Sequence, residues 1–176
     1  MDERHGTLPM QEIATVELPT RRATTRLGRW LAQGVIAGDL VVLTGGLGAG
    51  KTFLTRSVAR AMGVGPEIRV TSPTFTLVHE YETVPRLVHA DLYRVSDGSE
   101  VDQLLLREMR AHGAVLFVEW GEPYLRELGG DALLVKLEMS GPSRAATLVA
   151  TGPRARQWSS RALPNKLMVR ADDKQD

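Results

Sequence analysis

Eight consecutive residues could form a binding site for a nucleoside triphosphate. They are Gly45, Gly46, Leu47, Gly48, Ala49, Gly50, Lys51 and Thr52, and they fit the P-loop pattern G-x-x-x-x-G-K-[ST]. Glycines let the backbone N–H groups of such a loop curl around a phosphate, because no Cβ atoms stand in the way. Lys51 should face solvent in the empty loop and would reach the β- and γ-phosphates. The Thr52 hydroxyl would complete a Mg²⁺ shell. The spacing therefore predicts binding of a nucleoside triphosphate.

A P-loop needs a strand before it and a helix after it, and the sequence predicts both. Leu40–Leu43 is a short apolar run that fits a buried strand. Apolar residues then follow the loop at helical spacing: Phe53, Leu54, Val58, Ala61 and Met62. The partial positive charge at the start of this helix would point at the phosphates.

Two acidic residues follow short apolar runs, where a P-loop protein needs a second acid. Asp91 follows Leu87–Ala90, and Glu119 follows Val115–Val118. Glu119 is the stronger candidate, and we expect it to bind Mg²⁺, which commonly takes one or two carboxylates besides phosphates and waters. The end of a strand would also allow Glu119 to orient the attacking water, and Asp91 would then be the metal-binding acid.

Other polar and aromatic residues near these runs have two interpretations each. The segment Thr71–Thr74 carries three hydroxyls around a proline, and it fits a simple turn as well as a switch loop that senses the γ-phosphate. His79 and His89 are expected to be packed or surface histidines, because no cysteine or third histidine lies near them. Trp120 could lie against a base or a partner, whereas Trp30 fits the apolar face of a helix.

Composition limits the remaining classes. The chain has 176 residues, 22 Lys and Arg against 21 Asp and Glu, and no cysteine. It therefore suits one domain, has no field of one sign that would indicate direct nucleic-acid or membrane binding, and contains neither a disulfide framework nor a thiolate zinc site. No apolar run approaches the roughly 18 residues of a membrane-spanning helix, and the start lacks the apolar region of a signal peptide. We expect a cytoplasmic protein.

The other elements follow from periodicity and from turn residues. We expect residues 1–10 to form a loose leader, 11–152 the P-loop domain, and 153–176 a polar tail that is mobile or only locally ordered. A helix should begin at Thr20 and end with Gly38 as its C-cap. Ser99 should open a helix that buries Val101, Leu104, Leu105 and Met109. Strands are expected at Ile13–Leu18, within Arg69–Tyr81, at Leu87–Asp91, Val115–Glu119, Leu133–Met139 and Ala146–Ala150, with the second and third paired antiparallel.

Four motifs, in this order and spacing, resemble the TsaE family, the bacterial ATPases of the tRNA threonylcarbamoyladenosine pathway. They are Leu-Gly-Ala-Gly-Lys-Thr (47–52), Thr-Ser-Pro-Thr-Phe-Thr-Leu-Val (71–78), His-Ala-Asp-Leu-Tyr-Arg (89–94) and Val-Glu-Trp (118–120). The resemblance covers about Leu18 to Gly152. One departure is that the family usually has Asp where this chain has Gly46, which removes a carboxylate beside the phosphates.

The resemblance implies a P-loop NTPase-like α/β fold, a three-layer sandwich with a mixed central sheet flanked by helices. It implies that ATP and Mg²⁺ bind, with Thr52 and Glu119 holding the metal and with Lys51, Asp91 and Glu119 as the catalytic residues. Arg21, in the segment 20–24, and Arg144, in the loop 141–144, would flank the nucleotide base. The implied partners are TsaB and TsaD homologues, and tRNA only indirectly. ATP hydrolysis would cycle the TsaB–TsaD complex, which transfers threonylcarbamoyl to adenosine 37 of tRNA.

Two alternative functions remain at this level, a P-loop kinase and a nucleotide-gated binding module. A kinase needs an acceptor pocket and usually an arginine-bearing lid, and no arginine-rich insertion follows the P-loop. An arginine finger is worth about 10³–10⁵ in rate, and a partner can supply it. We therefore expect slow hydrolysis by the isolated chain.

Overall fold

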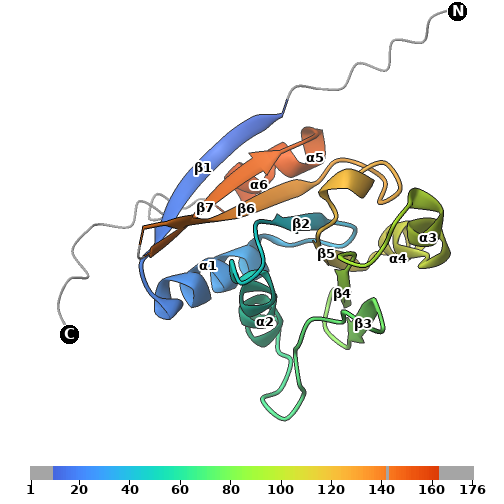
Figure 1. Ribbon diagram of the computed structural model, residues 1–176, viewed down its shortest axis with the longest axis horizontal. Coiled ribbons are helices and arrows are strands. Elements are labelled where there is room, and N and C mark those ends of the chain that lie inside the picture. Colours follow the sequence, from blue (N-terminus) through green and yellow to red (C-terminus); the bar gives the residue numbers. More distant parts are fainter. Residues whose placement is uncertain (1–9, 142, 163–176) are drawn as a thin grey trace, which may run out of the picture.

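The computed structural model describes residues 10–141 and 143–162. Seven strands form one mixed sheet in the order β1-β7-β6-β2-β5-β4-β3 (Figure 1). The strands are β1 (Gln11–Leu18), β2 (Leu40–Thr44), β3 (Val78–Tyr81), β4 (Leu87–Asp91), β5 (Val115–Glu119), β6 (Leu133–Ser140) and β7 (Ser143–Ala150). The helices are α1 (Arg21–Gly34), α2 (Lys51–Ala61), α3 (Gly98–Gln103), α4 (Leu106–Ala111), the 3₁₀ turn η1 (Glu122–Tyr124), α5 (Pro153–Arg156) and α6 (Trp158–Ala162).

The middle of the sheet is parallel and its two sides are antiparallel. Strands β6, β2, β5 and β4 run parallel, while β7 and β1 on one side and β3 on the other are antiparallel to their neighbours. Strands β2, β4 and β5 are apolar along most of their length because helices cover both of their faces. The expected antiparallel pairing of β3 with β4 is confirmed, although only Val78–Tyr81 of the segment 69–81 is a strand.

Alternate residues of the central strands contribute to two separate cores, which confirms the three-layer fold. On one face, residues of α1, α2 and α6, such as Leu54 and Trp158, share one core with Phe117 of β5. On the other face, α3 and α4 pack against the same strands through Val101 and Leu106. Because side chains alternate across a strand, the odd-numbered residues of β2, β4 and β5 all face α2.

Helix α1 starts as predicted and ends earlier than predicted. The Thr20 hydroxyl accepts a hydrogen bond from the Ala23 N–H at 3.2 Å, as an N-cap does. The helix ends at Gly34, and Val35 already has an extended backbone. Gly38 is therefore not the C-cap. Its positive φ of 82° is used in the turn that leads into β2.

The helix expected after Ser99 is divided in two. Asp97 caps α3 by accepting from the N–H groups of Ser99 and Glu100. The backbone then turns at Leu105, whose φ is +54°, before α4 begins. Val101 is buried as predicted, but the turn leaves Leu105 54% exposed and buries Leu106 in its place. The expectation for Leu105 is wrong because a continuous helical period was assumed.

The first part of the expected C-terminal tail belongs to the folded domain. Helix α6 lies against α1, and α5 lies against β7 and α6. Trp158 is 1% exposed, and the centre of its ring is 6.1 Å from that of Trp30. The Asp131 carboxylate accepts from the N–H groups of Arg154 and Ala155 and so caps α5. The expectation of a tail is thus wrong for residues 153–162, which pack on the domain. The sequence did not show this because Asp131 and Trp30, their partners, lie far away along the chain. Residues 163–176 and residues 1–9 of the leader lie outside the described residues.

Within the described residues, no helix is long and apolar enough to span a bilayer.

Candidate nucleotide-binding site

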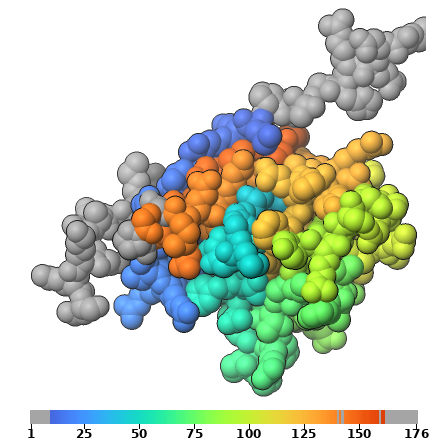
Figure 2. All heavy atoms as spheres, viewed as in Figure 1, coloured from blue at the N-terminus to red at the C-terminus, as the bar shows by residue number. Residues whose placement is uncertain are grey.

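The P-loop connects the carboxyl end of β2 to the first residue of α2, as its sequence requires. Gly50 has a φ of +108° immediately before Lys51, a conformation that side chains with a Cβ rarely adopt. At Gly45 an added Cβ would lie 2.2 Å from the Leu137 carbonyl oxygen. Gly45 therefore lets the loop pass close to the backbone of β6, and Gly50 lets the chain turn into the start of α2. Figure 2 shows this cyan region at the surface, with the orange β6–β7 segment beside it.

Lys51 is buried within the loop, at 5% exposure. The expectation that it faces solvent in the empty loop is therefore wrong. Its Nζ donates to the carbonyl oxygens of Gly45 at 2.6 Å and Gly46 at 3.0 Å. The same Nζ lies 3.9 Å from the centre of the Trp120 ring, which can stabilise a cation through its π-face. Burial lowers the pKa of Lys51, while the nearby Glu119 and Asp91 act to raise it. The loop carbonyls and the indole thus replace water around this ammonium group.

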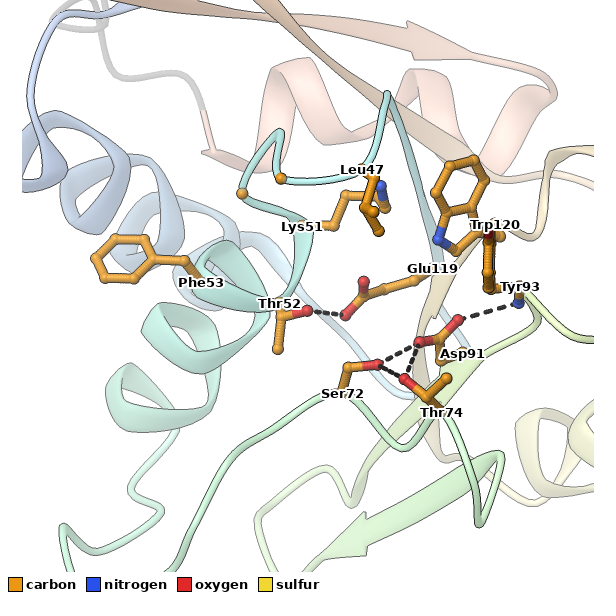
Figure 3. A pocket seen from close by; sticks show the side chains of 12 residues that line it. Leu47, Lys51, Thr52, Phe53, Ser72, Thr74, Asp91, Tyr93, Glu119 and Trp120 are labelled. Atoms are coloured by element: carbon orange, nitrogen blue, oxygen red, sulfur yellow. Dashed lines mark hydrogen bonds between the residues drawn. The ribbon is translucent and has the colours of Figure 1, made fainter.

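Glu119 ends β5 and is only 3% exposed. Its Oε1 accepts a hydrogen bond from the Thr52 hydroxyl at 2.8 Å, because Thr52 lies in the first turn of α2 directly across from this strand end (Figure 3). The His89 Nε2 lies 2.9 Å from the same oxygen. The predicted metal-binding pair, Thr52 and Glu119, is therefore brought together.

Asp91 lies beside Glu119, because β4 and β5 are parallel and these two residues are register partners. Its Oδ2 accepts from the hydroxyls of Ser72 and Thr74, the latter at 3.0 Å. Its Oδ1 accepts from the Tyr93 N–H at 3.0 Å. The segment Thr71–Thr74 is thus hydrogen-bonded to a carboxylate of the site, which a simple turn would not require. Its role as a switch stays a prediction.

These residues surround a cavity of about 380 Å³ (Figure 3). Its lining consists of Leu47, Gly48, Gly50, Lys51, Thr52, Phe53, Ser72, Thr74, Asp91, Tyr93, Glu119 and Trp120. One ammonium, two carboxylates and three aliphatic hydroxyls thus line a cavity at the start of α2, where the helix dipole favours an anion. The arrangement can hold phosphate groups together with a cation.

A second, smaller cavity of about 180 Å³ shares Gly48, Gly50 and Phe53 with the first. Arg21 and Arg144, predicted to flank the base, both line it, and the Arg21 guanidinium carbon is 5.9 Å from the centre of the Phe53 ring. The β6–β7 hairpin brings Arg144 to the P-loop from far along the chain. Contact of either arginine with a nucleotide stays a prediction.

The donor set at Glu119 fits magnesium better than a softer metal. Thr52 and Glu119 offer oxygen atoms only, which Mg²⁺ prefers, and phosphates and waters commonly complete its shell. Among the described residues, no group of three or more His, Cys, Asp or Glu side chains could hold a metal by itself. An ion bound here would therefore depend on phosphate oxygens as well.

Sequence reasoning missed the role of His89, which it treated as an unassigned packed or surface residue. His89 is fully buried and contacts Glu119 across two strands. The signal that could have found it is the period of two in β4, which places His89 on the same face as Asp91.

At Gly46, where the family usually has Asp, an added Cβ would meet nothing within 4 Å, so the loop has room for that side chain.

Comparisons with known proteins identify the family of this chain. The family model "Threonylcarbamoyl adenosine biosynthesis protein TsaE" matches residues 18–146. The TsaE protein of Streptomyces coelicolor is 43% identical over 115 residues, covering 64% of this chain and 76% of its own. The TsaE protein of Mycobacterium tuberculosis is 40% identical over 149 residues, covering 78% and 84%. The crystal structure of Bacillus subtilis YdiB superposes with a TM-score of 0.72 at 26% identity, covering 86% of this chain and 94% of that one. The chain belongs to the TsaE family of threonylcarbamoyl adenosine biosynthesis proteins.

Proposed function

We propose that this protein binds ATP with Mg²⁺ and hydrolyses it slowly. By cycling a complex of TsaB and TsaD homologues in the cytoplasm, it supports threonylcarbamoyl transfer to adenosine 37 of tRNA. The observation that carries the proposal is the convergence of Lys51, Thr52, Asp91 and Glu119 on one cavity at the start of α2. Family membership supports the pathway, and the lining of the cavity supports the chemistry.

The two carboxylates have different surroundings, which supports different roles. The Thr52 hydroxyl donates to one oxygen of Glu119, so these two side chains lie close enough to hold Mg²⁺ together. The charge of the ion would neutralise that of the phosphates. Asp91 is oriented by two hydroxyls and one N–H group, so it would position a water at the phosphates. Lys51 would exchange its two loop carbonyls for phosphate oxygens.

The lining of this cavity supports the proposal of slow hydrolysis and of a need for partners. Within the described part of the chain, the lining of the larger cavity contains no arginine, and Lys51 is the sole cation there. The rim also exposes large apolar side chains, with Leu47 at 87% and Tyr93 at 56%. Exposed apolar groups beside a site commonly mark a protein interface. A partner that covers this rim would exclude water and could supply an arginine.

Phosphate release from ATP, measured with and without TsaB and TsaD homologues, tests the proposal. We expect a slow basal rate that rises when both partners are present. A phosphorylated acceptor would indicate a kinase, and binding without either product would indicate a nucleotide-gated module. A fast basal rate that ignores the partners would contradict the proposal.

Glu119→Gln tests the metal role, because it keeps the size and one acceptor oxygen but removes the charge. We expect it to raise the Mg²⁺ concentration required for ATP binding, measured by calorimetry. Glu80→Gln is the matched control, since Glu80 lies exposed on β3 and pairs with Arg86 outside the cavity. Unchanged Mg²⁺ dependence with lost hydrolysis in Glu119→Gln would instead leave Asp91 as the metal-binding acid.

A further inference from the structure

His89 is a polar side chain buried where an apolar one would be expected. It lies in the middle of β4, where Leu87, Val88 and Ala90 are all fully buried, and its own exposure is 0%. Burying an imidazole among apolar side chains costs free energy unless a hydrogen bond compensates for the lost water. The structure shows one such contact for the ring, 2.9 Å from Nε2 to Glu119 Oε1. The function of His89 must therefore be sought at Glu119.

The direction of this hydrogen bond follows from its partners. A carboxylate oxygen accepts only, so the hydrogen must lie on Nε2. The other ring nitrogen, Nδ1, is buried and has no hydrogen-bond partner among the described residues. A hydrogen on Nδ1 would then be a buried donor without an acceptor, at a cost of about 1–3 kcal/mol. The surroundings therefore select the tautomer that donates to Glu119.

Two donors from different elements hold one oxygen of Glu119. Thr52 donates to Oε1 from α2, and His89 donates to the same atom from β4. No described residue forms a hydrogen bond with the second oxygen, Oε2, which belongs to a side chain that lines the cavity. The two donors thus determine the rotation of the carboxylate about its last bond. They leave one oxygen for a ligand that carries positive charge.

We propose that His89 is a positioning residue that orients Glu119 toward the Mg²⁺ of the bound nucleotide. The proposal rests on the proposed function, because it assumes a metal held by Thr52 and Glu119. His89 itself does not line the cavity. Partners of metal ligands act in this way elsewhere, and their loss typically weakens metal binding by about 10–100-fold.

His89→Leu and His89→Gln separate positioning from packing. Leucine fills the apolar site without a donor, whereas the glutamine amide can place an N–H group near the position of Nε2. We expect His89→Leu to bind ATP at saturating Mg²⁺ but to need about 10–100-fold more Mg²⁺ for half-maximal binding. His89→Gln should recover most of that loss. Calorimetric titration of Mg²⁺ at fixed ATP measures the effect without relying on turnover, and thermal unfolding checks the fold.

His79→Leu is the matched control, because His79 is the register partner of His89 on β3 and its Nε2 contacts Thr76. It should leave the Mg²⁺ dependence unchanged. If His89→Leu does not fold, His89→Asn replaces it, since asparagine keeps the polarity but is too short to reach Glu119. A parental Mg²⁺ dependence in His89→Leu or His89→Asn would overturn the proposal, as would a glutamine variant no better than leucine. If the parental protein itself binds ATP without any need for Mg²⁺, the proposed function fails, not the positioning role alone.

Discussion

The two ends of the parallel strands both bury charged groups, and they treat them differently. At the amino end, the Asp39 carboxylate, 1% exposed, accepts from the Ile36 N–H at 2.9 Å, from Arg154 at 2.8 Å and from Arg161 at 3.1 Å. Beside it, the Arg110 guanidinium donates to four backbone carbonyls, those of Gly38, Leu128, Gly130 and Asp131. The charges at this end are satisfied within the protein.

At the carboxyl end, the charged groups are held by hydrogen-bond partners other than lysine and arginine in the part of the chain that the structure describes, and they face a cavity. Lys51 donates to backbone carbonyls, while Glu119 and Asp91 accept from hydroxyls, an N–H group and the His89 ring. No ion pair joins Lys51 to either carboxylate in the part of the chain that the structure describes. The comparison teaches that a buried carboxylate paired with two arginines stabilises the fold, whereas carboxylates held by hydroxyls, an N–H group and an imidazole beside a cavity remain available to a ligand.

Lys51→Ala should have the largest effect, and on function alone. Removing one preorganised group that stabilises developing charge typically costs about 10²–10³ in kcat. We expect a loss of that size in ATP turnover, measured as phosphate release. The melting temperature should not fall, because a buried charge is removed. Parental turnover in the purified variant would show that the P-loop assignment is wrong.

Asp39→Ala should have the converse effect, on stability alone. It leaves two arginines and one N–H group without their acceptor, and we expect a loss of about 2–4 kcal/mol in the free energy of unfolding. Denaturant unfolding measures this loss. ATP binding at a temperature where the variant is folded should be unchanged, since Asp39 lies at the opposite end of β2. Weaker ATP binding by the folded variant would remove the distinction between the two ends.

The pH dependence of stability should differ between the parental protein and Lys51→Met. Because burial lowers the pKa of Lys51 below its ordinary value of 10.5, the unfolded chain binds more protons than the folded one between these two pKa values. The free energy of unfolding contributed by this group should therefore rise with pH across that window. Lys51→Met keeps most of the apolar stem and should lack this rise. Equal slopes in denaturant unfolding at several pH values would show that Lys51 is not desolvated.

Arg86→Ala should have the smallest effect and sets the scale for the others. Its ion pair with Glu80, at 3.0 Å, joins side chains that are 50% and 43% exposed. Water screens such a pair, so we expect less than about 1 kcal/mol in the free energy of unfolding and no change in ATP binding. A loss as large as that of Asp39→Ala would mean that burial does not separate these two kinds of ion pair.

The sequence alone predicted the residues that could do chemistry and the local structure that carries them. The P-loop is a contiguous motif whose glycines meet local steric requirements, and Asp91 and Glu119 follow apolar runs that read as strands. The central strands, the caps at Thr20 and the α/β class follow from the same local periodicities. Such features depend on interactions among a few neighbouring residues, so they can be predicted from short stretches of sequence.

Tertiary structure decided which groups meet. The pairing of β4 with β5 brings the His89 ring within hydrogen-bond distance of Glu119. The β6–β7 hairpin brings Arg144 to the P-loop. The contact of Lys51 with the Trp120 indole, and the docking of residues 153–162, also depend on partners far along the chain. One of these contacts, between Trp30 and Trp158, joins residues more than a hundred positions apart. Local periodicity carries no information about such pairings, because packing and strand register select them only when the whole sheet has formed.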